Sequence, residues 1–467
     1  MSIRLYNSMR SQKEDFIPYE AGKVGIYCCG PTTYNFIHLG NARPLVVFDT
    51  IRRYFLYRGW QVKYVQNFTD VDDKIINRAR DEGSDPVSLA EKYIAAYFED
   101  TKALNILPAD EHPRVTAHID EIISLVQRII AAGHAYEADG DVYFDVRSLA
   151  SYGELSGRDI DDMRAGARVE VGDIKRDPMD FALWKKAKPG EISWTSPWGE
   201  GRPGWHIECS AMSCKYLGES FDIHGGGADL IFPHHENEMA QSKAAGYGFA
   251  RYWLHNGFIT VNEEKMSKSL GNFFLLRDIL AKFPGDVVRY YLLATHYRSP
   301  IDFSDDKLAS AAKSLQRIRN SYYLLQEGEK RATSMPARLT EKINTAKKAF
   351  IAALDDDFNT ALAISAIFDF CHELNTYLAE DQLSTADVED ALSLFDDFHA
   401  VLGMIIPTLA EKDGDSLVSP LLELIIKIRG TAREKKDWAT ADAIRDGLKD
   451  LGITIEDTPQ GARWKKI

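Results

Sequence analysis

The sequence predicts an α/β fold. A Rossmann-like, parallel-sheet nucleotide-binding domain is split by an insertion and followed by an α-helical bundle and a small C-terminal α+β domain. Three observations support this prediction. Residues 23–67 alternate strand, helix and strand, the pattern changes between residues 109 and 200, and helical periodicity dominates after residue 272. A strand–helix–strand unit has parallel strands, and ligands bind at their carboxyl ends.

Length and composition indicate a globular protein of several domains. The chain has 467 residues, a length that corresponds to about three domains. Its content of 45% hydrophobic and 27% charged residues is that of an ordinary globular protein. Its net charge of −14 argues against a cationic nucleic-acid coat but leaves room for a local basic surface. An odd number of cysteines, five, fits a reducing compartment. The start of the chain lacks an export signal, and no apolar run approaches the ~18 residues of a membrane span.

The first strand–helix–strand unit is the clearest of the predicted elements. The apolar run Lys23–Cys29 predicts a buried strand, residues 45–56 repeat apolar side chains at helical spacing, and residues 61–67 predict a second strand. The turn after the first strand lacks the G-x-G-x-x-G fingerprint of dinucleotide-binding proteins. It instead places His38-Leu-Gly-Asn41 at the helix start, where backbone N–H groups and the helix dipole favour phosphate.

A second segment strengthens the prediction of a phosphate site. The pattern H-x-G-N is short, so His38 alone could be an ordinary helix cap. Between residues 264 and 272, however, Lys265 and Lys268 lie three residues apart on a loop that contains a glycine near its end. Two ammonium groups at this spacing can neutralise a triphosphate. Either segment alone could be a solvated turn, but together they predict an ATP site with much higher specificity.

Residues 109–200 predict an inserted region. An amphipathic helical pattern covers residues 118–130, short strand-like runs such as Asp141–Val146 follow, and residues 175–185 return the chain towards the nucleotide-binding domain. We therefore expect two halves of the nucleotide-binding domain around the insertion, then a loop region, the bundle and the C-terminal domain. The expected boundaries, with the insertion second in order, are residues 1–108, 109–200, 201–260, 261–305, 306–410 and 417–467.

The densest group of reactive side chains lies between residues 204 and 238. The proline before His234 can begin a helix, because its missing N–H costs nothing in the first turn. His234 and Glu238 then share one helical face, although the neighbouring His235 is an alternative to His234. Zinc takes thiolate, imidazole and carboxylate ligands, and Cys209 supplies a thiolate. Each residue alone is more often a core, capping or surface residue, and a fourth ligand must come from elsewhere.

The other cysteines offer limited choices for that ligand. Cys28 and Cys29 are neighbours on the predicted first strand and point to opposite faces, so at most one can reach a metal. Cys214 lies about 140° around a helix from Cys209 at 3.6 residues per turn, and packing explains it better.

Beyond residue 272 the sequence predicts helices and then a basic end. Helical periodicity covers residues 287–294, 308–326, 339–354 and 361–378. Residues 424–467 hold ten lysines and arginines against seven acidic residues, opposite in sign to the whole chain. With Trp438 and Trp464, these basic groups could contact phosphates and stack on unpaired bases. Taken singly, each tryptophan is better explained as the core of a helix hairpin.

These motifs together resemble the class I aminoacyl-tRNA synthetases, whose two signatures correspond to residues 38–41 and to Lys265-Met-Ser-Lys-Ser269. Within that class the chain is similar, essentially from end to end, to the cysteinyl-tRNA synthetases. The segments that carry this similarity are residues 27–30, 67–74, 204–209 and 232–238. Two positions depart from the pattern. Asn41 stands where many class I enzymes have a second histidine, and Cys28 adds a cysteine before the motif cysteine.

The resemblance completes the expected metal site. The family motif selects Cys29 and His234, so the implied ligands of one Zn²⁺ ion per chain are Cys29, Cys209, His234 and Glu238. A pocket that relies on size alone discriminates near-isosteres by only about 10²-fold. Zinc would instead separate cysteine from serine, because the metal lowers the pKa of the thiol and binds the thiolate. Since three of the ligands are anionic, we expect the site to loosen Glu238 or to gain a fifth ligand when substrate binds.

The resemblance also implies a reaction in two steps. L-Cysteine and ATP, with Mg²⁺, give cysteinyl-adenylate, and the cysteinyl group then passes to the terminal adenosine of tRNA(Cys). The protein would position reactants and stabilise charge without a covalent nucleophile. The implied catalytic residues are His38, Asn41, Lys265 and Lys268. The implied ATP-binding residues are His38, Gly40, Asn41, Gly225, Gly226, Gly227, Asp229 and Lys268. The implied cysteine-binding residues are Thr69, Trp205 and His224, and the implied tRNA contacts are Arg429, Arg433, Lys436 and Trp438.

Two other functions fit parts of the sequence. A ligase of this fold that joins cysteine to an amino sugar would share the zinc pocket and both signatures, but would lack the anticodon domain. A non-catalytic RNA-binding relative could keep a relic metal site, yet both ATP signatures are present here. We expect a cytoplasmic monomer, without membrane association, whose partners are tRNA(Cys), L-cysteine and ATP.

Overall fold

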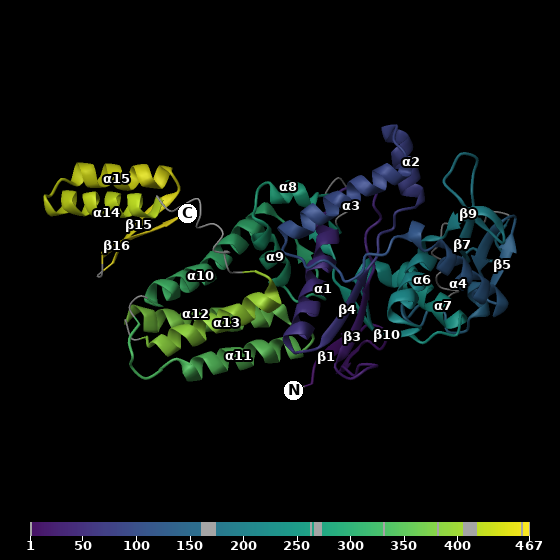
Figure 1. Cartoon of the computed structure of the whole chain (residues 1–467), viewed down its shortest axis with the longest axis horizontal. Coiled ribbons are helices and arrows are strands. Elements are labelled where there is room, and N and C mark those ends of the chain that lie inside the picture. The colour runs from purple at the N-terminus through teal and green to yellow at the C-terminus, as the bar shows by residue number, and fades with distance from the viewer. Residues whose placement is uncertain are drawn as a thin grey trace. The chain divides into compact units, whose positions relative to one another are not determined.

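The structure is a computed structural model that describes residues 2–159, 174–261, 264–265, 273–329, 332–380, 383–404, 418–458 and 461–466. The chain forms two compact units, Met1–Ile405 and Ile406–Ile467. The predicted α/β class is confirmed, with a parallel sheet, an antiparallel insertion and helical elements towards the C-terminus (Figure 1). None of the described helices is long and apolar enough to cross a membrane.

A four-stranded parallel sheet lies at the centre of the first unit, with strand order β11-β10-β3-β4. Its strands are β3 (Lys23–Cys28), β4 (Gln61–Gln66), β10 (Ser220–Gly227) and β11 (Phe249–Asn256). Tyr27 of β3 lies opposite His224 of β10 on one side and Val65 of β4 on the other. The segments before and after the insertion therefore meet in the middle of one sheet.

Helix α1 (Leu39–Tyr57) connects β3 to β4, as the predicted strand–helix–strand unit requires. It is buried on nearly all sides because the sheet covers one face while α9 (Gly285–Leu293) and α13 (Thr385–Leu402) cover another. The fully buried guanidinium of Arg289 bonds to the carboxylate of Asp49 on α1 and donates to the Leu402 carbonyl oxygen at 2.5 Å. One buried charge pair thus joins α1, α9 and the end of α13.

Further strands and helices surround the parallel sheet. A hairpin of β1 (Arg4–Asn7) and β2 (Gln12–Asp15) precedes it, and α2 (Asp73–Glu82) and α3 (Pro86–Ala103) follow β4. Helices α6 (Trp205–Leu217) and α7 (Glu236–Ala244) flank β10. A small sheet of β12 (Ile259–Val261), β13 (Glu264–Lys265) and β14 (Ile301–Asp302) lies beyond β11 in the chain.

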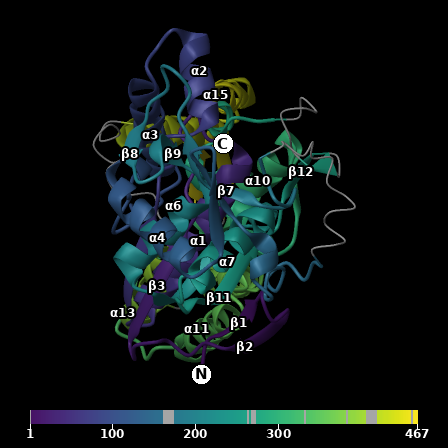
Figure 2. The ribbon, with the colours of Figure 1, turned by 90° about the vertical axis from the view of Figure 1, so that its right-hand side faces the viewer.

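The inserted region has its own antiparallel sheet, of order β5-β6-β7-β9-β8. After α4 (Ile119–Ala131), its strands are β5 (Ala135–Ala138), β6 (Asp141–Phe144), β7 (Phe181–Lys186), β8 (Trp194–Ser196) and β9 (Gly199–Pro203). Helices α4 and α7 both pack on α6, on the side shown in Figure 2. One hydrophobic core includes Tyr27, Ile122 and Trp184, so it continues from the parallel sheet into the insertion.

A bundle of long helices completes the first unit. The predicted helical segments correspond to α9, α10 (Asp305–Glu329), α11 (Thr340–Asp355) and α12 (Thr360–Ala379), and the short helix α8 (Leu276–Leu280) precedes them. Helix α13 adds a further member, which the sequence analysis did not identify. Its start is defined by a capping box in which Ser384 and Asp387 exchange hydrogen bonds with each other's backbone N–H groups.

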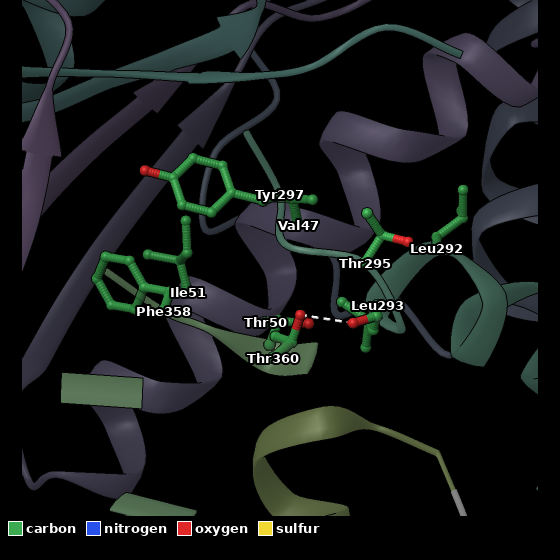
Figure 3. Close-up of a pocket in the computed structure, with 9 residues that line it drawn as sticks. All are labelled: Val47, Thr50, Ile51, Leu292, Leu293, Thr295, Tyr297, Phe358 and Thr360. Carbon is green, nitrogen blue, oxygen red and sulfur yellow. Dashed lines mark hydrogen bonds between the residues drawn. The ribbon is translucent and has the colours of Figure 1, made fainter. Parts of the chain in front are cut away.

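A small cavity lies between α1, α9 and the start of α12 (Figure 3). Thr360 Oγ1 donates a hydrogen bond to the Leu293 carbonyl oxygen at 2.6 Å beside it. None of the described residues that line this cavity carries a charge, so they offer no group that would bind a triphosphate. Its lining consists of Val47, Thr50, Ile51, Leu292, Leu293, Thr295, Tyr297, Phe358 and Thr360.

The second unit is a small α+β domain, as predicted. Helices α14 (Val418–Glu434) and α15 (Trp438–Asp450) form a hairpin. Strands β15 (Ile453–Thr458) and β16 (Gly461–Lys466) follow as an antiparallel pair.

We expect the substitution Asp387→Ala to destabilise the bundle. The buried Asp387 carboxylate accepts from Leu339 N–H at 2.7 Å, from Arg338 N–H at 2.8 Å and from the Ser384 hydroxyl at 2.8 Å. Burial acts to raise the pKa of Asp387, but these hydrogen bonds outweigh it and lower the pKa. A loss of about 3 kcal/mol is expected near neutral pH, measured as a lower midpoint in thermal unfolding.

The pH dependence of this loss follows from the lowered pKa of Asp387. The stabilisation is complete above the ordinary carboxyl pKa and disappears as the pH falls through the lowered value in the folded protein. The thermal-unfolding midpoints of the wild type and of Asp387→Ala should therefore approach each other in acid. The exposed Asp390→Ala on the same helix serves as the control and should change the midpoint little. A gap between wild type and Asp387→Ala that widens in acid would contradict this assignment.

Candidate metal centre and nucleotide site

The expected metal ligands lie on segments that meet at the carboxyl end of β3. Cys29 directly follows this strand, and its N–H donates to the Gly225 carbonyl oxygen of β10 at 3.3 Å. Cys209 lies in α6, while His234 and Glu238 lie on either side of the start of α7. Adjacent strands and two helices packed on them therefore deliver all these side chains to one place.

The chain leading to Cys209 depends on a glycine. Strand β9 ends at Pro203, and Gly204 caps the start of α6. A side chain at Gly204 would collide with the backbone of Ala182 in the neighbouring strand β7. Helix α6 can thus begin directly against the sheet of the insertion, which sets the position of Cys209 one turn later.

The local conformation before α7 explains the position of His234. Phe232 is extended, with φ −138° and ψ 132°, and helical turns begin immediately after it. A proline at the first helical position is favourable because the N–H that it lacks would have no partner there. His234 and Glu238 consequently lie on one face, with His234 Nε2 3.0 Å from Glu238 Oε1.

The side chains of the expected ligands form a compact group. Cys29 Sγ lies 3.7 Å from Cys209 Sγ and 3.4 Å from Glu238 Oε1, and Cys209 Sγ lies 3.7 Å from His234 Nε2. All ligand atoms of the group lie within 4.8 Å of one another. In a tetrahedral zinc site with Zn–S bonds of about 2.3 Å, two sulfur atoms are about 3.8 Å apart. The donor types and their spacing fit zinc.

A second group of possible ligands shares Cys29 and Glu238 but replaces the others with His224 and His235. His224 Nε2 lies 2.8 Å from Glu238 Oε2, and His235 Nε2 lies 3.4 Å from Cys29 Sγ. Such contacts are typical of residues that do not bind the metal themselves but hydrogen-bond to a metal ligand and fix its orientation. His224 was expected to contact cysteine, yet it is fully buried against Glu238. Its contact with cysteine stays a prediction.

Cys28 and Cys214 belong to neither group of possible ligands among the described residues. Cys28 is buried in β3, and burial is the main cause that raises the pKa of its thiol to about 12. Cys214 lies near the end of α6 and belongs to neither group of possible ligands within the described part of the chain. The structure therefore agrees with the interpretation of both as packing residues.

Burial also sets the protonation of the ligand group. It raises the pKa of the Cys29 thiol, and the nearby Cys209 and Glu238 raise it further. It lowers the pKa of His234 to about 3, so this imidazole is neutral and can offer a lone pair. Because the thiols must lose protons to bind a metal, metal affinity should fall in acid.

Other side chains surround the ligand group. The Trp205 ring stacks on the His234 ring, with centroids 4.3 Å apart, and is 38% exposed. His206 Nδ1 lies 2.9 Å from His234 Nδ1, and Asn67 Oδ1 lies 3.7 Å from Cys209 Sγ. Of these, the sequence analysis selected only Trp205. The Asn67 segment had been noted as a motif, but no spacing signal linked His206 to the metal.

The first ATP signature forms the start of α1. His38 is the N-cap residue, and it exchanges hydrogen bonds with Asn41 in a capping box. Asn41 N–H donates to His38 Nδ1 and His38 N–H donates to Asn41 Oδ1, each at 3.2 Å. Since Nδ1 accepts, the neutral imidazole of His38 carries its proton on Nε2. His38 is thus a helix cap, as the simpler interpretation held, and its contact with phosphate stays a prediction.

Of the second ATP signature, residues 265–269, the structure describes only Lys265. Lys265 lies in β13, paired with Thr260 of β12, and Lys268 lies outside the described residues. The next described residues, from Phe273 onwards, lie against the first signature, where Leu39 N–H donates to the Phe274 carbonyl oxygen at 3.1 Å. The Phe273 ring packs on the His38 ring with centroids 4.7 Å apart. The fold therefore holds Phe273 and Phe274, which follow the second signature in the chain, beside the first signature.

Close packing explains the glycines at the end of β10, which the sequence analysis assigned only to nucleotide binding. A side chain at Gly225 would overlap the Phe48 ring of α1, and one at Gly226 would approach the His235 ring to 2.9 Å. A side chain at Gly227 would meet Asp229, which is exposed in the following turn. Close approach of these backbones to a nucleotide stays a prediction.

The expected tRNA contacts lie in the second unit. Arg433 lies in the last turn of α14, Lys436 adopts a left-handed conformation (φ 58°) after that helix, and Trp438 begins α15. Trp438 is 57% exposed, so its interpretation as hairpin core is wrong. Arg429, in contrast, is only 7% exposed.

Comparison with known proteins agrees with this fold. The family described as tRNA synthetases class I (C) catalytic domain matches residues 15–313, and the DALR domain matches residues 349–406. The cysteinyl-tRNA ligase anticodon binding domain matches residues 419–464. Among solved structures, a Mycobacterium tuberculosis methionyl-tRNA synthetase in complex with methionyl-adenylate has a TM-score of 0.61 at 17% identity, covering 84% of this chain and 93% of that chain. The fold and the catalytic-domain match define a class I aminoacyl-tRNA synthetase, which is a ligase.

Relatives of known name identify the branch of that class. A cysteine–tRNA ligase of Heliobacterium modesticaldum is 59% identical over 100% of both chains. One of Desulforamulus reducens is 60% identical over 99% of this chain and 100% of the relative. The chain belongs to the cysteine–tRNA ligase family.

We expect the purified protein to hold one zinc ion per chain and the variant Cys209→Ser to lose most of it. A serine hydroxyl stays protonated near neutral pH and is a poor zinc ligand. Elemental analysis after gel filtration measures the metal. Cys214→Ser, five residues further along the same helix, is the matched control and should retain zinc. Equal zinc loss in both variants would contradict the assignment of Cys209.

Zinc binding also distinguishes the role of His234 from that of His235. We expect His234→Ala to abolish stoichiometric zinc, since it removes a ligand. His235→Ala should retain zinc with an affinity about 10- to 100-fold lower, the usual effect of removing a residue that orients a ligand. Titration with a competing chelator gives the affinities. The reverse order of effects would favour the alternative group that contains His224 and His235.

Proposed function

We propose that this chain activates L-cysteine with ATP to form cysteinyl-adenylate and transfers the cysteinyl group to the 3′-terminal adenosine of tRNA(Cys). We further propose that direct thiolate–zinc coordination selects cysteine. The observation that carries this proposal is the group of Cys29, Cys209, His234 and Glu238, with ligand atoms within 4.8 Å of one another. A zinc ion in this group would supply a soft Lewis acid that binds thiolate in preference to hydroxyl.

The side chains around this group would bind and orient the amino acid. Trp205 stacks on His234 and is partly exposed, so it can form one wall of the pocket. The second oxygen of Glu238 is engaged by His224, which holds the carboxylate in one orientation. Thr69 is fixed to the loop after β3 by a backbone hydrogen bond to Pro31.

The two signatures would act on ATP, with Mg²⁺ on its triphosphate. Displacement at the α-phosphate needs donors aimed at the developing negative charge. His38 would supply such a donor from the start of α1, where its capping box with Asn41 fixes its position. We propose that Lys265 and Lys268 bind the departing pyrophosphate. The backbone contact of Leu39 with Phe274 supports this role, because it holds the segment that follows these lysines in the chain beside the start of α1.

The C-terminal part of the chain favours tRNA as the acceptor over an amino sugar. A ligase that joins cysteine to a small amine has no need of an anticodon-binding domain, whereas residues 419–464 match one. The exposed Trp438, which lies within the basic residues 424–467, supplies an aromatic face on which an unpaired base can stack. We propose the bundle, residues 306–410, as a further tRNA-binding region.

Cysteine-dependent exchange of pyrophosphate into ATP tests this function. We expect exchange with cysteine and almost none with serine. In Cys209→Ser, cysteine activation should fall by at least about 10²-fold, the scale of discrimination that size alone provides, with little change in ATP affinity. The control Cys214→Ser should behave as wild type. Pyrophosphate exchange without cysteine, or an equal loss of ATP binding in Cys209→Ser, would contradict the proposal. An aminoacylation assay with and without tRNA(Cys) distinguishes tRNA from an amino sugar as the acceptor.

A further inference from the structure

An arginine near the start of α1 is fully buried and bonds only to distant backbone among the described contacts. Arg43 lies five residues after His38 and is 0% exposed. Its guanidinium donates to the Phe258 carbonyl oxygen at 2.8 Å and to the Tyr297 carbonyl oxygen at 3.1 Å. It also donates to the Ser299 carbonyl oxygen. Carbonyl groups from two distant segments of the chain therefore converge on one side chain.

The chemistry of arginine suits this set of contacts. A guanidinium group carries five N–H donors in one rigid plane, whereas the lysine ammonium is a single nitrogen at the end of a flexible chain. Burial lowers the pKa of Arg43 to about 10, so the side chain still carries its charge and all its protons near neutral pH. A substitution to lysine would keep the charge but would lose the planar group that holds both segments together.

The three carbonyl groups lie where two strands of the small sheet meet. Phe258 directly precedes β12, and Ser299 lies two residues before β14. The Phe258 carbonyl oxygen also accepts from Ile301 N–H at 2.9 Å, and Gly257 N–H donates to the Tyr297 carbonyl oxygen at 2.9 Å. Arg43 thus binds carbonyl groups that also pair these two strands, and it fixes both strands to α1.

The same small sheet carries Lys265 of the second signature. Strand β13 pairs antiparallel with β12, so that Lys265 lies opposite Thr260, which is two residues beyond Phe258. On α1, Arg43 lies two residues beyond Asn41 of the first signature. A short path of backbone pairs and one side chain therefore connects the two signatures. Displacement of β12 relative to α1 would change the distance between them.

The chain after the second signature is fixed to the start of α1 by other contacts. Leu39 N–H donates to the Phe274 carbonyl oxygen at 3.1 Å, and Leu276 N–H donates to the Ile37 carbonyl oxygen at 2.9 Å. These are backbone hydrogen bonds that do not involve Arg43. A change at Arg43 should therefore affect the segment before the second signature and leave the segment after it in place.

On the basis of the function proposed above, we propose that Arg43 is a positioning residue that sets the place of Lys265 relative to His38 during cysteinyl-adenylate formation. It acts through β12 and β14 and contacts no substrate. In this step, donors from both signatures must meet one triphosphate, and a misplacement of about 1 Å can cost about 10²-fold in rate. Transfer of the cysteinyl group to tRNA follows the departure of pyrophosphate, so this second step should not need Arg43.

The two steps of the reaction, measured separately on the zinc-loaded full-length protein, test this proposal. In Arg43→Lys, we expect kcat for cysteine-dependent pyrophosphate exchange, corrected for the folded fraction, to fall by about 10²-fold. KM for cysteine and the zinc content should change by less than about twofold, because the metal group is intact. Transfer from preformed cysteinyl-adenylate to tRNA(Cys) should change by less than about threefold.

The matched control is Arg52→Lys, on the same helix. Arg52 is 9% exposed, donates to the Pro108 carbonyl oxygen at 2.5 Å and forms an ion pair with Asp110 at 2.8 Å. The same substitution thus removes the same kind of contact from a segment outside the small sheet. Both variants should have a lower midpoint of thermal unfolding. The folded fraction of Arg52→Lys should form cysteinyl-adenylate as the wild type does.

Hydrogen–deuterium exchange and a second variant keep the test decisive if Arg43→Lys does not fold. In Gly257→Ala, the added Cβ would lie 2.6 Å from the Ser299 carbonyl oxygen, so it separates the same segments while Arg43 is retained. In both variants the N–H groups of Gly257 and Ile301 should exchange faster, while that of Leu276 should not. Gly257→Ala should also slow adenylate formation more than transfer.

The outcomes separate this inference from the proposed function. Equal losses in adenylate formation and in transfer would show a general structural role and would overturn the positioning role of Arg43. Faster hydrogen–deuterium exchange at Gly257 and Ile301 without a loss of adenylate formation would overturn it as well. A wild-type protein without cysteine-dependent pyrophosphate exchange would instead overturn the function on which the inference rests.

Discussion

The architecture depends on the pairing of β3 with β10. These strands come from opposite sides of the insertion, and their pairing brings Cys29 against Gly225 at 3.3 Å between backbone N and O. Helices α6 and α7, packed on the sheet and on each other, then carry Cys209, His234 and Glu238 to the same point. Burying thiols and a carboxylate together is unfavourable without a cation. The sheet, the insertion and both helices together impose this arrangement, and a metal would stabilise it.

The first ATP signature is held by a helix that packs on the same sheet. Helix α1 begins with the capping box of His38 and Asn41, and its middle is fixed to the bundle through Asp49 and the fully buried Arg289. The end of α13 accepts a hydrogen bond from the same guanidinium, so movement of the bundle against the catalytic sheet would break a buried charge pair. Removing one partner of such a pair usually costs several kcal/mol. The bundle therefore serves as a rigid support for the start of α1.

Much of the candidate site could be predicted because its signals are local. His234 and Glu238 share a face by helical spacing, His38 and Asn41 begin a helix, and the doublet Cys28–Cys29 divides between core and site because strand residues alternate. Other features had no local signal. The contact of His235 with Cys29, the packing of Gly225 on Phe48 and the exposure of Trp438 each depend on which distant segment lies opposite.

The sequence by itself determined the fold class, the order of its parts, the residue types of the metal group and the two signatures, because periodicity, caps and motif spacing are properties of neighbouring residues. Only the tertiary structure decided which groups surround those residues. It placed His224 behind Glu238 rather than in an open pocket, and it joined Thr69 of one strand end to Glu208 of a helix 139 residues later. Such pairings arise from the packing of α6 against the sheet, and the spacing of residues along the sequence does not predict them.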